Sequence, residues 1–268
     1  MAVTRGMASL RAACRLVPGV PVPEPATAIA NPGSTTWVPA ARLGEPTVVA
    51  TAFDALRAVG GSRNAAAMAF LQGVAYAVVG PTVAGSLGPG VVPPPQPAGA
   101  WFGFRAGGFC DRVAYEALDI VPAEPGEFED RVAESALEVL TPVVDHLHRS
   151  SGLGGRVLWS TVPDSIMAIG LAWAARSAGS PRALPAATRH AWSRSTALID
   201  ALAQRVPSMS ARPRRLRVTG PGGAVTWMVR GGCCFVYRDT AQYCLACPVM
   251  DDDARGELLM GWLLGSDG

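Results

Sequence analysis

The feature that most constrains this chain is a group of cysteines near its C-terminal end. Four of the six cysteines lie within fifteen residues: Cys233 and Cys234 are adjacent, and Cys244 and Cys247 follow as a C-x-x-C pair. A disulfide framework, a zinc knuckle, a dithiol redox site and an iron–sulfur cluster all use cysteines at short spacings. These four interpretations imply different proteins, so the rest of the sequence has to distinguish them.

The spacing of the four cysteines favours a metal centre. A C-x-x-C turn brings two sulfurs to one metal atom. Neighbouring side chains of an extended strand point to opposite faces, so Cys233 and Cys234 reach one centre only where the backbone turns. Gly231 and Gly232 directly precede them and supply that freedom. A thioredoxin-like site is disfavoured, because Pro248 follows the C-x-x-C pair and the pair ends a loop. Four thiolates complete either a zinc site or a 2Fe–2S cluster, and the spacing alone leaves both open.

Composition excludes several other chemistries. The 268 residues are 49% hydrophobic and 16% charged, which is enough for one large domain or two small ones with a sizeable core. All 23 positively charged residues are arginines, so no lysine can contact a phosphate in a Walker A loop or form a Schiff base. No glycine-rich dinucleotide fingerprint is found. A net charge of +2 gives no argument for nucleic acid or for an anionic membrane.

The N-terminal residues do not resemble a secretory signal. Arg5, Arg11 and Arg15 interrupt the first twenty residues, and no continuous apolar region follows them. The expected location is therefore the cytoplasm, where structural disulfides are rare. The disulfide framework is the first interpretation to be dropped on this ground.

A segment without charged residues, from residue 64 to residue 104, raises the question of a membrane span. Its apolar part, AAAMAFLQGVAYAVVGPTVAG, is rich in alanine and is broken by Pro81. Alanine and glycine insert weakly into bilayers. The segment is therefore predicted to be a buried core helix.

The hydrophobic pattern predicts an α+β fold that is mostly helical. Helices are expected at 51–59, from Ser62 as N-cap to Val79, at 127–149, 162–177 and 185–205, and over DDDARGELLMGWLL at the end. Hairpins are expected over AWFGFRAGGFCDRVAYEAL, turning at Gly107-Gly108, and over RRLRVTG and AVTWMVR around GPGG. The proline-rich stretches 17–33 and 88–100 are expected to be extended connectors.

The cysteine segment resembles a known family. The pattern R-x-x-C-C-x-x-Y followed by C-x-x-C-P is similar to the C-terminal signature of the FhuF-like ferric-siderophore reductases; here it is formed by Arg230, Cys233, Cys234, Tyr237, Cys244, Cys247 and Pro248. Upstream, RVLWSTVPDSIMAIGLAW and SRNAAAMAFLQGVAYAVVGPTVAG also resemble segments of that family. The resemblance implies a helical fold with a small antiparallel sheet.

The same resemblance implies a function. In that family the four cysteines bind a 2Fe–2S cluster, which implies the same role for Cys233, Cys234, Cys244 and Cys247. The implied activity is one-electron reduction of a ferric siderophore in the cytoplasm, with a ferredoxin or flavoprotein reductase as external electron donor. Residues 1–210 would then form the siderophore-binding body and 211–268 the cluster-binding segment. Peripheral membrane contact is left open, and no nucleic acid is expected.

Two other functions remain open at this point. The four cysteines could hold a structural zinc ion in a non-enzymatic interaction protein. A 2Fe–2S protein could instead be an electron carrier or a redox sensor without siderophore reduction.

Other candidate residues have both a structural and a functional interpretation. Arg212, Arg214, Arg215 and Arg217 could attract an anionic siderophore or an acidic donor, or could be the charged face of an edge strand. His146 and His148 are two residues apart on a helix and are not expected to share a metal, and His190 is expected to be structural. Cys14 and Cys110 are expected to be free and buried. Trp227 and Tyr237 are expected to pack over the cysteine cluster, and Asp251, Asp252 and Asp253 to cap the last helix.

Overall fold

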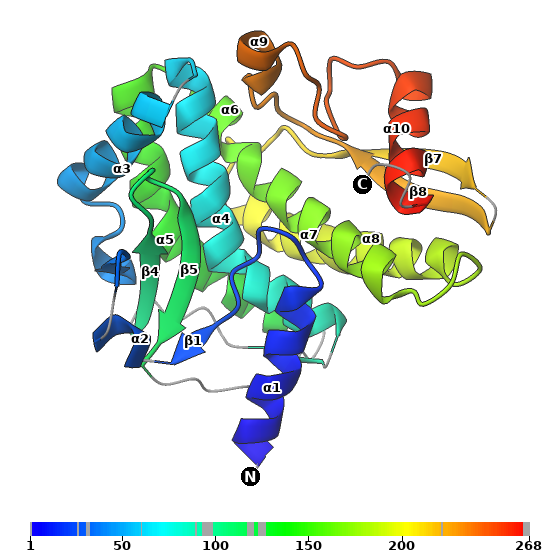
Figure 1. Cartoon of the computed structure of the whole chain (residues 1–268), viewed down its shortest axis with the longest axis horizontal. Coiled ribbons are helices and arrows are strands. Elements are labelled where there is room, and N and C mark those ends of the chain that lie inside the picture. Colours follow the sequence, from blue (N-terminus) through cyan, green and yellow to red (C-terminus); the bar gives the residue numbers. More distant parts are fainter. Residues whose placement is uncertain are drawn as a thin grey trace.

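A long apolar helix, α4 (Arg63–Leu87), lies at the centre of the computed structural model (Figure 1). The structure describes residues 2–25, 27–30, 33–59, 61–88, 90–92, 99–116, 121–122, 127–220 and 222–264. Ser62 caps α4 as predicted, since its side chain accepts a 3.3 Å hydrogen bond from the Ala65 N–H. The helix continues past Pro81 to Leu87, eight residues beyond the predicted end, because buried side chains on both sides of the proline pack against neighbouring helices.

The apolar length of α4 is explained by burial in the fold. Among the described residues, two helical segments, 63–87 and 155–177, are long and apolar enough to cross a membrane, and 78% of the most apolar window of each is buried. Such burial is typical of core helices in soluble proteins. The predicted core helix is therefore confirmed.

Five further helices form most of the body. They are α1 (Ala2–Arg15), α3 (Pro46–Val59), α5 (Glu127–Ser151), α7 (Thr161–Ser177) and α8 (Leu184–Arg205), and shorter turns are α2 (Thr27–Ala30), η1 (Ala40–Arg42) and α6 (Gly155–Trp159). The helices α1, α3, α5 and α7 pack on α4. The predicted apolar stripe of α5 is buried, from Val132 to Leu147. No helix was predicted for residues 2–15.

A small sheet covers one side of the helical body (Figure 1). Its order is β1 (Glu24–Pro25), β5 (Cys110–Tyr115), β4 (Ala100–Phe104) and β2 (Thr36–Pro39). The predicted hairpin of β4 and β5 is confirmed, with Gly108 in the left-handed region at φ +78°. The sheet is mixed rather than antiparallel, because the proline-rich segment contributes β1, which runs parallel to β5. Arg112 of β5 fixes that edge through two 2.6 Å bonds to the Glu24 carboxylate.

The C-terminal segment lies on α8 (Figure 1). It contains the predicted hairpin of β7 (Arg214–Gly220) and β8 (Gly223–Val229), then α9 (Val236–Thr240) and α10 (Asp252–Leu264). The turn between β7 and β8 includes residue 221, and the connector 88–100 includes residues 89 and 93–98, which lie outside the described part. A two-stranded antiparallel sheet pairs β3 (Val91–Val92) with β6 (Val121–Pro122). The predicted α+β class is confirmed, and the boundary at 210/211 stays a prediction.

Candidate metal centre

The four clustered cysteines lie on one loop whose two ends are hydrogen-bonded together. Strand β8 leads into Arg230, and the Arg230 N–H donates to the Ala246 carbonyl oxygen at 2.9 Å. The Cys247 N–H donates to the Cys244 carbonyl oxygen at 2.9 Å and closes the C-x-x-C turn. The loop therefore leaves the sheet and returns to it at the same place.

A buried carboxylate of the helical body holds the start of this loop. Asp164, near the N-terminal end of α7, is 2% exposed. Its oxygens accept the N–H of Gly231 at 2.7 Å, the N–H of Gly232 at 3.2 Å and the Nε–H of Arg230 at 3.2 Å. Burial raises the pKa of Asp164, although Arg230 and the two glycine N–H groups act in the opposite direction. One side chain of the body thus fixes three consecutive residues before the cysteine pair.

The two glycines before the cysteine pair are required by close packing, whereas the sequence suggested that they give the backbone freedom to turn. A Cβ on Gly232 would lie 1.9 Å from the Ser160 Oγ, and one on Gly231 would lie 2.7 Å from backbone atoms of Arg212. Neither glycine has a positive φ. The left-handed residues of the loop are Phe235, at φ 62° directly after the cysteine pair, and Ala241, at φ 57° directly after α9.

The turn at Phe235 keeps the sulfur of Cys233 in contact with the backbone. The Phe235 N–H points at the Cys233 sulfur, with a nitrogen–sulfur distance of 3.3 Å. Tyr237 follows on α9 and stacks on Tyr243 with 5.6 Å between ring centroids. This ring contact is with a tyrosine and not with a cysteine, so the predicted packing of Tyr237 over the cysteine cluster stays a prediction.

The sulfurs of this loop interact with one another. Cys234 and Cys244 are hydrogen-bonded, which lowers the pKa of Cys234 to about 5 and raises the pKa of Cys244. Cys233 and Cys247 also act electrostatically within the group, and the positive charge of Arg230 lies close to Cys234 and Cys244. Within the described residues, no three Cys, His, Asp or Glu side chains are arranged to hold a metal ion. The donors fit zinc or 2Fe–2S in kind and in number, and binding would require their sulfurs to close around it.

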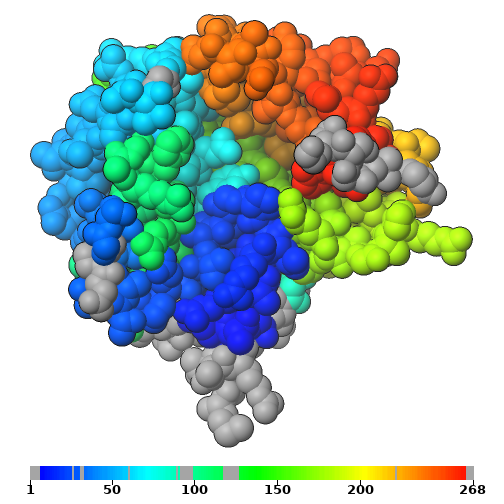
Figure 2. Space-filling view, viewed as in Figure 1, coloured from blue at the N-terminus to red at the C-terminus, as the bar shows by residue number. Residues whose placement is uncertain are grey.

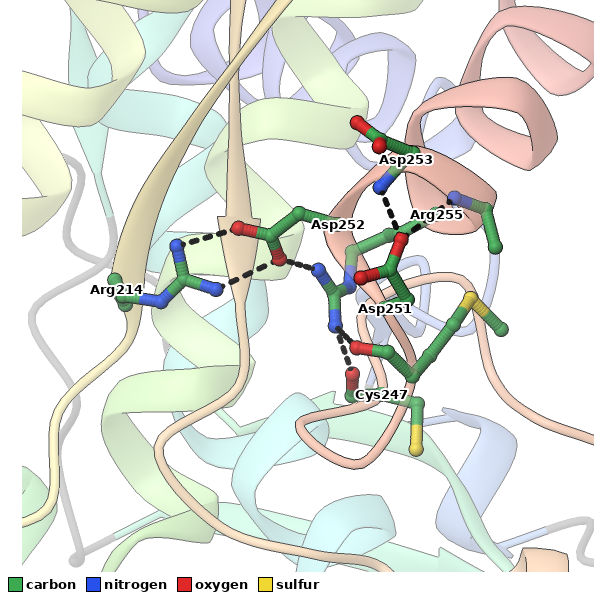
Figure 3. A network of polar contacts seen from close by, with 8 residues as sticks. Arg214, Cys247, Asp251, Asp252, Asp253 and Arg255 are labelled. Atoms are coloured by element: carbon green, nitrogen blue, oxygen red, sulfur yellow. Dashed lines mark hydrogen bonds and ion pairs between the residues drawn. The ribbon is translucent and has the colours of Figure 1, made fainter.

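A second set of contacts, which we call the Arg255 clamp, holds the end of the loop (Figure 3). Arg255 of α10 is completely buried, and its guanidinium donates to the carbonyl oxygen of Cys247 at 2.6 Å and to that of Met250. It also contacts Asp252, which receives two bonds of 2.8 and 3.0 Å from Arg214 of β7. A basic side chain thus fixes the backbone at the second cysteine pair, just as an acidic one does before the first.

A cavity lies beside the cysteine loop. Its volume is about 310 Å³, and its lining includes Cys244 of the loop, Trp227 of β8 and residues of α4 and α7. Figure 2 shows the surface hollowed where the orange and red C-terminal segment meets cyan α4 and the blue N-terminal part. The loop is therefore next to a space that a small molecule could enter.

Asp164 and Arg255 were missed by reasoning from the sequence. Each has a recognisable signal: Asp164 is the one charged residue of the apolar stretch VLWSTVPDSIMAIGLAWAA, and Arg255 follows three aspartates within a short helix. Neither signal identifies the partner, because the contacts of Asp164 are made across more than sixty residues of sequence.

Most of the other candidate residues have structural roles. Arg212 pairs with Asp200, Arg214 with Asp252, and Arg215 bonds to Thr226 and lies over the Trp192 ring, while Arg217 is exposed. The structural interpretation of the first three arginines is therefore favoured.

The predicted cap of α10 is formed by Asp251, whose Oδ1 accepts the Asp253 N–H at 2.8 Å. Trp227 is buried and packs on Trp262 with 5.3 Å between ring centroids.

The histidines do not form a metal pair. His148 is exposed and its Nδ1 lies 2.6 Å from the Leu153 carbonyl oxygen. His146 is half-buried, burial lowers its pKa, and its Nδ1 has no partner among the described residues. His190 is exposed on α8, so no contact in the described part of the chain supports its predicted structural role.

Comparison with protein-family models and with curated proteins found no match for this chain.

Thiol alkylation tests the arrangement of the six cysteines. Cys14 and Cys110 are free and buried as predicted, and burial raises the pKa of Cys14 to about 12. We expect iodoacetamide at pH 7 to modify the native metal-free chain first at the partly exposed pair Cys234 and Cys244, because their hydrogen bond stabilises a thiolate, and to spare the buried Cys14 and Cys110. Peptide mass spectrometry measures the order. Equal modification of all six cysteines in the native chain would contradict this arrangement, and the urea-unfolded chain is the positive control.

Proposed function

We propose that this protein is a cytoplasmic ferric-siderophore reductase that carries a 2Fe–2S cluster on Cys233, Cys234, Cys244 and Cys247. The observation that supports it best is the position of Cys244, which belongs both to the group of interacting thiols and to the lining of the cavity. A cluster ligand and a space for substrate would then share one side chain. The resemblance of the cysteine segment to the siderophore-reductase signature supports the same proposal.

The substrate chemistry requires only an electron. Ferric iron is a hard ion that siderophore oxygens hold tightly, and one added electron lowers its charge and weakens that preference. When bound, a 2Fe–2S cluster supplies electrons one at a time. The ferric ion gains the electron, the protein loses it, and an external one-electron donor, a ferredoxin or flavoprotein reductase, restores it.

The residues around the loop would hold and tune such a centre. Asp164 and Arg255 fix the backbone before the first cysteine pair and at the second. The buried positive charge of Arg230 lies next to Cys234 and Cys244 and would stabilise the negative charge added on reduction. It would therefore favour the reduced state of a cluster held there.

A single-turnover assay tests the proposed reaction. The protein is reduced with one electron equivalent of dithionite and freed of excess reductant. It is then mixed with a ferric siderophore, and ferrous iron is trapped with a coloured chelator. We expect about one Fe(II) per reduced chain, and none from Cys234→Ser. The matched control is Cys110→Ser, which removes a buried cysteine of β5, outside the loop, and is expected to keep the activity. Reduced protein that converts no ferric siderophore would refute the reductase and leave an electron carrier or sensor.

A further inference from the structure

We infer that the cavity beside Cys244 binds an aromatic chelating arm of the siderophore, that is, a ring carrying adjacent oxygen atoms. This inference rests on the proposed function and adds the substrate class to it. The cavity of about 310 Å³ lies at the small end of the range of ligand sites, roughly 300–1,000 Å³. It is therefore sized for one arm of a chelate rather than for a whole ferric complex with several arms.

One end of the cavity is polar and lies at the cysteine loop. Arg230 and Asp164 form its wall there, and Arg230 is close to Cys244. Gln72 of α4 accepts a long 3.5 Å bond from Arg230, and Tyr76, one turn further along α4, bonds to Gln72. These groups offer hydrogen bonds to ring oxygens close to a proposed cluster ligand.

A buried hydroxyl in the same wall has no partner within the described structure. Ser165 of α7 is 2% exposed, lines the cavity, and its Oγ makes no hydrogen bond there. A helical serine that does not bond back to its own helix, and that is shielded from water, carries a cost unless something else satisfies it. Rotation of the Ser165 hydroxyl into the cavity would let an oxygen atom of a bound ring satisfy it.

The other part of the cavity is aromatic. Trp227 of β8 and Trp262 of α10 line it, with their rings tilted by 52°. Aromatic walls favour a planar ring over an aliphatic group, because ring contacts add to area burial. Ala168 and Ala172 of α7 also line the cavity, and their short side chains leave room for a ring. The combination of an aromatic part and a polar end at Cys244 distinguishes an aryl arm from an aliphatic hydroxamate arm.

Calorimetric titration of the full chain tests this site without any redox step. The probe is iron-free 2,3-dihydroxybenzoate, and acetohydroxamate is the non-aromatic comparison. We expect the aryl probe to bind, Ser165→Ala to weaken it about fivefold to tenfold, and Ala172→Leu, which fills the cavity, to abolish it. The matched control is Ser195→Ala, which removes another buried hydroxyl without a partner, on α8 and outside the cavity lining.

The possible results separate this inference from the proposed function. Three results would each overturn the aryl site. The aryl probe could fail to bind, acetohydroxamate could bind equally well, or both Ser165→Ala and a folded Ala172→Leu could bind the aryl probe as the wild type does. Loss of the site with siderophore reduction intact would leave the reductase standing. Binding of the aryl probe at this cavity without any reduction of a ferric aryl siderophore would keep the site and refute the reductase.

Discussion

Replacement of Asp164 by alanine is expected to lower the free energy of unfolding by about 3–5 kcal/mol. The change leaves the Arg230 guanidinium, which is 10% exposed, without its ion-pair partner, and it leaves the N–H groups of Gly231 and Gly232 without an acceptor. A buried charge that loses its partner costs far more than an exposed one, because water cannot replace the lost contact. Urea unfolding of the metal-free chain measures the change.

The control for Asp164 is an exposed ion pair in the same part of the fold. Asp200→Ala removes the partner of Arg212, where both side chains are nearly half exposed, and is expected to cost at most about 1 kcal/mol. The double variant Asp164→Leu with Arg230→Met is expected to regain part of the stability, because it removes both buried charges but still leaves the Gly231 and Gly232 N–H groups without an acceptor. A loss for Asp164→Ala no larger than that for Asp200→Ala would show that the buried carboxylate does not hold the loop.

Replacement of Arg255 by methionine is expected to cost about 2–4 kcal/mol and to release the second cysteine pair. Methionine fills much of the volume but removes the guanidinium donor of the Cys247 and Met250 carbonyl oxygens, and the Cys247 oxygen keeps only the long 3.4 Å bond from the Met250 N–H. The C-x-x-C turn then loses its anchor to α10. Cys247, which is 2% exposed in the native fold, is expected to become accessible to alkylation.

The matched control for Arg255 is its neighbour in the same network. Arg214→Met removes the exposed partner of Asp252 and is expected to cost at most about 1 kcal/mol, without exposing Cys247. If Arg255→Met left both the unfolding free energy and the protection of Cys247 unchanged, the clamp shown in Figure 3 would have no role in holding the loop.

Local patterns in the sequence were sufficient for most of the helices. Ser62 marks the start of α4, and the apolar stripe from Val132 to Leu147 marks the buried face of α5, because capping and helical periodicity are local properties. The parallel strand β1 was not predictable, since its pairing with β5 joins residues ninety positions apart. The same is true of the end of α4, where packing on both sides of Pro81 overrides the preference of proline to end a helix.

The candidate site was predictable in its donors but not in its support. The spacing of the four cysteines predicts a ligand set, because the chemistry of thiolates limits what such a group can hold, and this assignment stays a prediction. The contacts of Asp164 with Gly231 and of Arg255 with Cys247 depend on how α7 and α10 pack on the loop. The role of Gly232 was not predictable either, because the sequence suggested backbone freedom, whereas close contact with Ser160 requires a glycine there.

The most direct test of the central claim is the metal content of protein purified without oxygen. An absorption spectrum, counts of iron and acid-labile sulfide per chain, and electron paramagnetic resonance after dithionite reduction identify the centre. The account predicts a red-brown protein with about two irons and two sulfides per chain and a paramagnetic signal on reduction. A colourless protein with one zinc ion per chain would contradict it, because zinc has no redox chemistry and could pass no electron to a siderophore.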